Sequence, residues 1–141
     1  MKEIIEKIEE FDTHENRILI HDPPPDEKYG KTYNGYKIYT NKQEIILGIT
    51  NIDSCCENWG YFVSNDNIDN FVGAELLGIS VTDTCLRTHK LPEPNYNDEF
   101  DAIFVDIKTS NGVLQFTAYN DGRYGHTAIV VSNQLNVEKY L

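Results

Sequence analysis

Alternation of apolar and polar residues dominates the chain from Tyr29 onward. The segments "YNGYKIYT" and "QEIILGI" both show it, and the "TNKQ" between them has the composition of a turn. This pattern predicts two antiparallel strands joined in a hairpin. "AELLGISVT" predicts a further strand, and "SCCENWGYF" (residues 54–62) has a strand pattern interrupted by unusual polar side chains.

The segment "AIFVDIKTSNGVLQFTAYN" predicts a second hairpin, because Asn111-Gly112 favours a tight turn. With Ser110 opposite Val113, one face is wholly apolar, as a core face should be. Its members are Ile103, Val105, Ile107, Leu114, Phe116 and Ala118. The other face would pair Lys108 with Gln115, Asp106 with Thr117, and Phe104 with Tyr119.

A second two-residue turn at Asp121-Gly122 would continue this meander through "RYGHTAIVV". It would place Tyr124 opposite Tyr119 and His126 opposite Thr117. The polar face, with Phe104 and Asp106 added, would then suit a flat polar ligand such as a nucleobase. The alternative is that Tyr, Thr and Phe stand there simply because strands favour them.

Helical signals are short. Ile4, Ile5, Ile8 and Phe11 in "KEIIEKIEEF" follow helical spacing, which predicts a short amphipathic N-terminal helix. "NDNIDNFVG" predicts one or two helical turns, begun by Asp66 or Asn67 and ended at Gly73. "NRILI" is a brief strand candidate, and residues 84–99 are expected to form a long loop. The predicted fold is α+β, mainly β, with an antiparallel meander or Greek-key sheet.

Length and composition constrain this expectation further. The 141 residues predict one domain with an N-terminal helix and extension (1–28), a β core (29–132) and a C-terminal tail (133–141). Three cysteines favour a reducing cytosol, and no apolar run has the length of a membrane span. A net charge of −11 argues against nucleic-acid polymers and anionic membranes as partners.

Catalytic and metal-binding templates are weak. Cys55-Cys56 lacks the CxxC spacing of zinc and redox sites, and the four histidines show no i, i+4 pair. No catalytic residue, metal or cofactor is therefore expected. An enzyme that uses Cys55 or Cys56 as nucleophile remains an alternative, and it would show a low-pKa thiol that reacts readily with alkylating reagents.

Two basic positions stand out in so acidic a chain. "LRTHK" brings together Arg87, His89 and Lys90, and Arg123 lies near the end of the predicted hairpin. Such groups hold anions, with Arg able to contact phosphate through two nitrogens. The alternative is a solvated loop that happens to be basic. Asn58 and Trp59 are expected to line a pocket or a subunit contact.

Several of these segments together resemble a viral family, that of the first Thoeris anti-defence protein and its relatives. They are "GKTYNGYKI", "SCCENWGYF", "DNIDNFVG" leading into "AELLGIS", and "TSNGVLQFTAYNDGRYGHTAIV". The likeness covers residues 29 to 132. Arg123 departs from it, because relatives usually have Tyr or another residue there, and "YND" replaces a Ser-Asn or His-Asn pair.

The resemblance implies a phage-encoded sponge in the host bacterial cytoplasm, forming dimers or hexamers. It would bind a cyclic ADP-ribose isomer of the glycocyclic type, or another cyclic nucleotide, without cleaving it, and so silence Thoeris-like antiviral defence. The residues expected to bind that ligand are Asn58, Trp59, Arg87, His89, Lys90, Phe104, Tyr119, Asn120, Arg123, Tyr124 and His126. The rival function is an acidic inhibitor that binds a host or defence nuclease, of an anti-CRISPR type.

Overall fold

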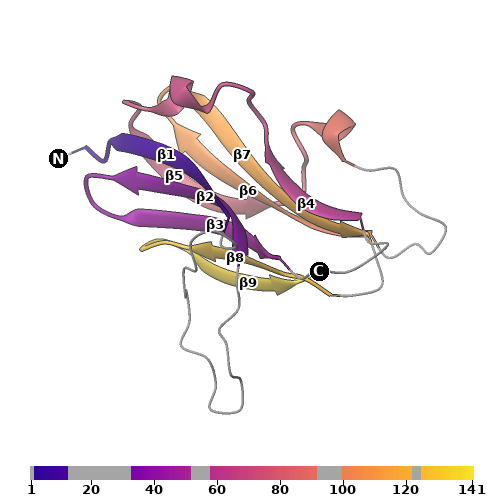
Figure 1. Ribbon diagram of the computed structural model, residues 1–141. Helices are drawn as coiled ribbons and strands as arrows, with labels where there is room; N and C mark the ends of the chain where they lie inside the picture. Colours follow the sequence, from indigo (N-terminus) through magenta and orange to yellow (C-terminus); the bar gives the residue numbers. More distant parts are fainter. Residues whose placement is uncertain (1, 13–32, 52–57, 92–99, 122–124) are drawn as a thin grey trace, which may run out of the picture.

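The computed structural model describes residues 2–12, 33–51, 58–91, 100–121 and 125–141. Nine strands within these ranges form two antiparallel sheets that pack face to face (Figure 1). The five-stranded sheet contains, in spatial order, β1 (Ile5–Asp12), β2 (Tyr33–Thr40), β3 (Glu44–Thr50), β8 (Thr127–Val131) and β9 (Asn136–Tyr140). The four-stranded sheet contains β4 (Asn58–Val63), β7 (Gly112–Asp121), β6 (Phe100–Thr109) and β5 (Leu76–Thr82).

Two 3-10 helices, η1 (Ile68–Phe71) and η2 (Thr88–Lys90), are the helical segments of the described chain. The mainly β class is therefore confirmed, as is the short helical turn that precedes Gly73. η2 lies within the segment expected to be a long loop. None of the described helices is long and apolar enough to cross a membrane.

The predicted N-terminal helix is wrong, because residues 5–12 form β1, which pairs with β2. The register shifts between Ile5 and Lys7, and this irregularity explains why the pattern misled. A β-bulge breaks the two-residue alternation, so Ile5 and Ile8 can both face the core of a strand. Three-residue spacing then resembles one turn of a helix.

The apolar face predicted for the β6–β7 hairpin is confirmed, since all six of its residues are buried. The predicted register is wrong by two residues: Thr109 lies opposite Gly112, and Asp106 lies opposite Gln115. A shift of two leaves every side chain on its own face, so the core pattern could not distinguish the two registers. The predicted β2–β3 hairpin is confirmed.

The predicted continuation of the meander is also wrong. β8 pairs with β3 and β9 in the five-stranded sheet, and the strand beside β7 is β4. The segment expected as a C-terminal tail contains β9. The strand candidate "NRILI" and the Asp121-Gly122 turn lie wholly or partly outside the described residues.

Both sheets contribute to one core. Its buried members include Ile38, Leu47 and Val130 from the larger sheet, and Val105 and Phe116 from the smaller one. β4 is an edge strand of the smaller sheet. Its Trp59 and Tyr61 rings pack against the core but stay partly exposed at this edge of the sandwich.

Candidate functional site

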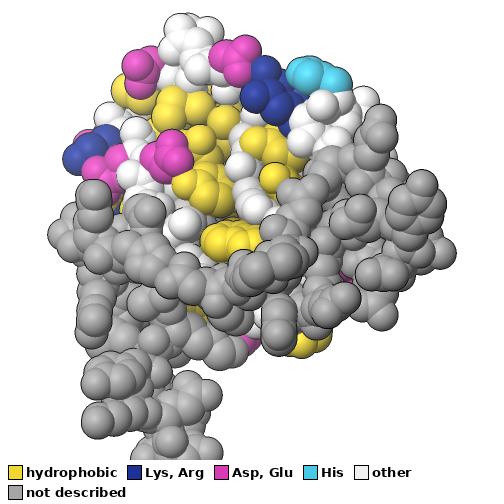
Figure 2. Space-filling model, turned by 45° about the vertical axis from the view of Figure 1, so that its right-hand side comes forward, with side chains coloured by type: hydrophobic (Ala, Val, Ile, Leu, Met, Phe, Trp, Pro, Cys, Tyr) yellow, Lys and Arg dark blue, Asp and Glu magenta, His cyan; other side chains and the backbone are white. Residues whose placement is uncertain are grey.

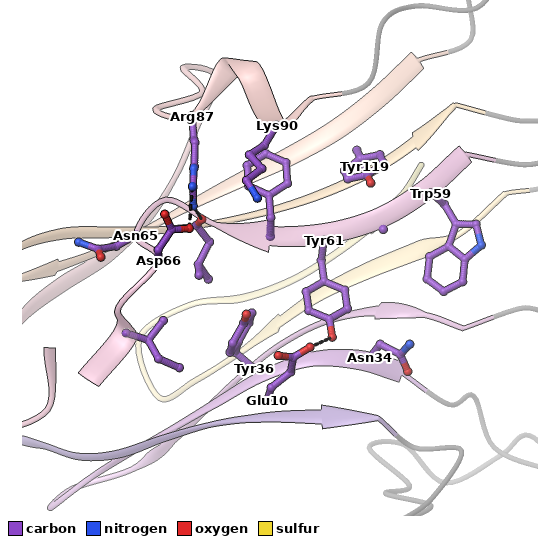
Figure 3. A pocket seen from close by; sticks show the side chains of 14 residues that line it. Glu10, Asn34, Tyr36, Trp59, Tyr61, Asn65, Asp66, Arg87, Lys90 and Tyr119 are labelled. Carbon is purple, nitrogen blue, oxygen red and sulfur yellow. Dashed lines mark hydrogen bonds and ion pairs between the residues drawn. The ribbon is translucent and has the colours of Figure 1, made fainter. Parts of the chain in front are cut away.

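A pocket of about 640 Å³ lies along β4, between the edges of the two sheets (Figure 3). This volume falls within the roughly 300–1,000 Å³ of small-molecule sites. The pocket is lined by Glu10, Asn34, Tyr36, Trp59, Gly60, Tyr61, Phe62, Val63, Asn65, Asp66, Ile68, Arg87, Lys90 and Tyr119. Figure 2 shows apolar side chains at the centre of the face turned forward. Basic side chains and a histidine lie at its upper right with an acidic side chain beside them, and acidic and basic side chains lie together at its left.

One side of the pocket is aromatic. Tyr61 of β4 meets Tyr36 of β2 edge to face, with 5.7 Å between ring centroids, and both rings pack on Phe116. The Tyr61 hydroxyl donates a hydrogen bond of 2.5 Å to Oε1 of Glu10 in β1. Rings held in this way offer a rigid surface on which a planar ligand can stack.

Two tyrosine hydroxyls that line the pocket, those of Tyr36 and Tyr119, stay protonated at neutral pH because their pKa values are raised. Burial, with a smaller contribution from the Glu10 carboxylate, raises the pKa of Tyr36 above its ordinary value. Burial likewise raises the pKa of Tyr119. The pocket therefore presents hydroxyl donors together with the Glu10 carboxylate and the Asn34 amide, groups that can bind a ribose or the edge of a nucleobase.

The opposite side of the pocket is basic. Arg87 precedes η2, and Lys90 ends it. Buried Gln115 of β7 holds this segment in place, because its side chain accepts from the Leu86 N–H and donates to the Thr84 carbonyl, both at 2.8 Å. The segment thereby lies over the outer face of the smaller sheet.

Arg87 makes two contacts through its guanidinium group. Nη2 lies 2.6 Å from Oδ1 of Asp66, and Nη1 donates to the Val63 carbonyl at 3.3 Å. The hydrogen bond and charge of Arg87 lower the pKa of Asp66, and Lys90 and His89 act in the same direction more weakly. Asp66 is therefore ionised at neutral pH, and the Arg87 charge is balanced locally.

Tyr119 reaches the pocket across β4. It lies opposite Gly60 in the β4–β7 pair, and its ring lies 6.1 Å from that of Phe62. A Cβ atom at Gly60 would come within 2.9 Å of the Tyr119 hydroxyl oxygen. Glycine is thus required at this position if the Tyr119 ring is to cross the strand.

Trp59 and His126 form a stacked pair, with ring centroids 4.6 Å apart and an interplanar angle of 24°. His126 is fully buried, and its Nδ1 lies 2.8 Å from the carbonyl oxygen of Thr50. The imidazole thus backs the indole that lines the pocket.

Four of the residues expected to bind ligand line this pocket: Trp59, Arg87, Lys90 and Tyr119. Phe104 and His89 lie elsewhere, Phe104 half-buried on β6 and His89 exposed on η2. Asn120 is buried, and its side chain donates to the Leu141 carbonyl at 3.3 Å. His126 touches the site only through Trp59.

The side chains of three residues expected to bind ligand lie outside the described part of the structure. Asn58 begins β4, but its side chain lies outside the described residues, as do Arg123 and Tyr124. The expected polar face that joined His126 to Thr117 and Tyr119 does not form, because His126 precedes a strand of the other sheet. This correction follows directly from the placement of β8.

Sequence reasoning missed the aromatic side of the pocket that Tyr36 and Tyr61 form. Tyr36, Tyr61 and Glu10 come from three strands that are distant along the chain, and each fits an ordinary strand pattern. In the sequence pattern, Asp66 is recognisable only as a possible start of the helical turn before Gly73. A usable signal was the density of aromatic residues in "YNGYKIY" and "WGYF".

Cys55, Cys56 and Glu57 lie outside the described residues, and Cys85 is a half-buried free thiol. Within the described ranges, no three His, Cys, Asp or Glu side chains are grouped so as to hold a metal ion.

Comparison with known proteins places the chain in a family. The family model described as "Domain of unknown function (DUF7448)" matches residues 2–130. No curated protein and no solved structure matches the chain.

Proposed function

This chain belongs to the DUF7448 family, and we propose that it is a phage-type sponge, a protein that sequesters a cyclic nucleotide immune signal. The signal is a cyclic ADP-ribose derivative of the glycocyclic type or a related cyclic nucleotide. The protein acts in the host bacterial cytoplasm, holds the ligand without cleaving it, and so blocks Thoeris-like defence.

The observation that carries the proposal is the pairing of rings and cations around one pocket. Trp59, Tyr61 and Tyr36 supply surfaces for adenine, while Arg87 and Lys90 stand where phosphate oxygens could be bound. These two kinds of group come from opposite sides of β4, so a cyclic ligand that carries its base and its pyrophosphate on different parts of one ring could contact both.

Local charge also supports an anionic ligand. The molecule carries a net charge of −11, yet the pocket contains two acidic residues, Glu10 and Asp66, and two basic ones. An anion approaching this pocket therefore meets a site that is neutral in formal charge.

The sponge is further proposed to be a homo-oligomer. Strand β5 carries no charged residue, and its Leu77 and Val81 are 62% and 45% exposed. In so acidic a protein, an uncharged edge strand is where two copies can approach with least repulsion, and exposed edges readily pair with another strand. Light scattering on the protein sample used for the binding measurements gives the mass of the assembly, which should be a multiple of the mass of one chain.

The test is calorimetry and thermal shift with cyclic ADP-ribose isomers, followed by recovery of the ligand after heat denaturation. We expect tight binding, a higher melting temperature and an unaltered ligand. Lys90→Ala should weaken binding about tenfold or more, since a charge-assisted hydrogen bond contributes about 1.5–3 kcal/mol.

Lys108→Ala is the matched control for that variant. Lys108 is likewise exposed, but it lies on β6 and does not line the pocket. Equal weakening by both substitutions would mean that general charge, rather than the pocket, governs binding.

A further inference from the structure

Arg87 is held in position by the protein independently of Asp66. Its side chain is 15% exposed, and Nη1 is fixed on the Val63 carbonyl. The segment that carries it is pinned by Gln115 through two hydrogen bonds of 2.8 Å. The guanidinium would therefore stay in place if its acidic partner moved away.

Asp66 is far less constrained. Its side chain is 81% exposed, and its contact with Arg87 is the single ion pair that it makes within the described residues. The neighbouring backbone is set by Asn65, whose Oδ1 accepts from the Asn67 N–H at 2.9 Å. Rotation of the Asp66 side chain into solvent would therefore leave this turn intact.

A carboxylate on an arginine fork occupies the place that a phosphate would take, because both anions accept from the same guanidinium donors. Exposed ion pairs of this kind are weak, with a median of about 0–1 kcal/mol, so a multivalent anion can displace the carboxylate. Both residues line the pocket and point toward each other there (Figure 3).

We infer that Asp66 is a built-in competitor that occupies the anion position of Arg87 and that a phosphate-bearing ligand must displace. This inference rests on the proposed function and assigns Asp66 as a residue that sets affinity and specificity. Anions that make only one contact would fail to displace the carboxylate. A ligand that also stacks on the rings of Tyr36 and Tyr61 would displace it.

The decisive experiment is Asp66→Asn, with calorimetric titration of inorganic pyrophosphate and of cyclic ADP-ribose at low ionic strength. Removing the competing charge should tighten pyrophosphate binding about three- to fivefold over the native chain, which is the gain expected when a ligand no longer has to displace an exposed ion pair. The affinity of Asp66→Asn for cyclic ADP-ribose should also be higher than that of the native chain.

Asp69→Asn is the matched control. Asp69 lies in η1, three residues away, and its removal changes the net charge identically, but it does not line the pocket. We expect less than a twofold effect. An equal gain in both variants, or weaker binding by Asp66→Asn, would overturn the inference, the second because Asp66 would then be positioning Arg87.

The two proposals fail in different ways. Suppose that Asp66→Asn gains affinity for pyrophosphate while no cyclic ADP-ribose isomer binds either protein. Competition by Asp66 would then be supported, and the proposed sponge function would be wrong. If the native chain binds such an isomer and Asp66→Asn binds it no better, the sponge stands and the competitor is wrong. Absence of binding in every arm would overturn both.

Discussion

Phe116 is the residue that links the two sheets beneath the pocket. It is 1% exposed on β7, and its ring lies 6.3 Å from that of Tyr36 in the other sheet and 6.1 Å from that of Tyr61. Two of the rings assigned to ligand stacking therefore depend on one core side chain. At the scale of residues, the site and the core are continuous.

Phe116→Ala should destabilise the protein by about 3–5 kcal/mol, because it removes a buried ring and leaves a cavity. Chemical denaturation measures the change in the free energy of unfolding. Val113→Ala, on the same strand but at a position 40% exposed, should change it by less than about 0.5 kcal/mol. A small effect of Phe116→Ala would contradict the central place given to this ring.

Tyr33 gives the protein a pH limit on the alkaline side. Burial, with a contribution from the charge of Glu138, raises the pKa of Tyr33 to about 12. The folded state therefore keeps the phenolic proton after an unfolded chain has lost it near pH 10. This stabilisation is fully present below pH 10 and is lost as the pH rises toward 12.

Denaturation midpoints measured from pH 9 to pH 12 should fall for the native chain and fall less steeply for Tyr33→Phe. At about 1.4 kcal/mol per pKa unit, a shift of two units corresponds to a difference of up to about 3 kcal/mol. Parallel curves for the two proteins would show that the Tyr33 hydroxyl does not govern alkaline stability.

At the scale of elements, turns and bulges decide what patterning leaves open. The irregularity after Ile5 turns a helix-like spacing into a strand, and the β6–β7 turn lies one residue before its expected place, which shifts each pairing partner by two residues. Gly112 has a φ of +112°. The Thr109 hydroxyl accepts from the Asn111 N–H at 3.1 Å and donates to the Gly112 carbonyl at 2.7 Å. Such features are local, and a two-residue period does not encode them.

Gly112→Ala should cost about 1–3 kcal/mol of stability, because a Cβ is strained at that φ although no atom lies within 4 Å of it. Gly78→Ala is the control: its Cβ would also meet open space, and its φ lies outside the positive range. It should be neutral or slightly stabilising. Equal effects of the two substitutions on the melting temperature would contradict the turn geometry.

The residues of the site show the same division between what sequence could and could not predict. Arg87 and Lys90 were recognisable because cations are scarce in this chain, and Trp59 because it is the one tryptophan. Tyr36 and Glu10 were not, because only the packing of β1 and β2 against β4 brings them to the pocket. A residue type that is rare in a chain can be picked out from the sequence as a candidate for the site. A common residue type can be assigned to the site only once the fold shows where it lies.

At the scale of the whole molecule, the main error concerned which sheet receives β8. The run "TAIVV" is almost wholly buried, so its composition fits a place in either sheet. Its actual place beside β3 removes His126 from the β7 face and leaves β4 to flank β7. The result is a two-sheet sandwich whose pocket lies at the β4 edge, with cations on one side and rings on the other.

The most direct test of this account is titration of the purified chain with cyclic ADP-ribose isomers in a calorimeter, with chromatography of the ligand recovered after heating. We expect saturable binding that is lost or much weakened in Lys90→Ala and kept in Lys108→Ala, with the nucleotide returned unchanged. No heat with any isomer, or a hydrolysed product, would contradict it.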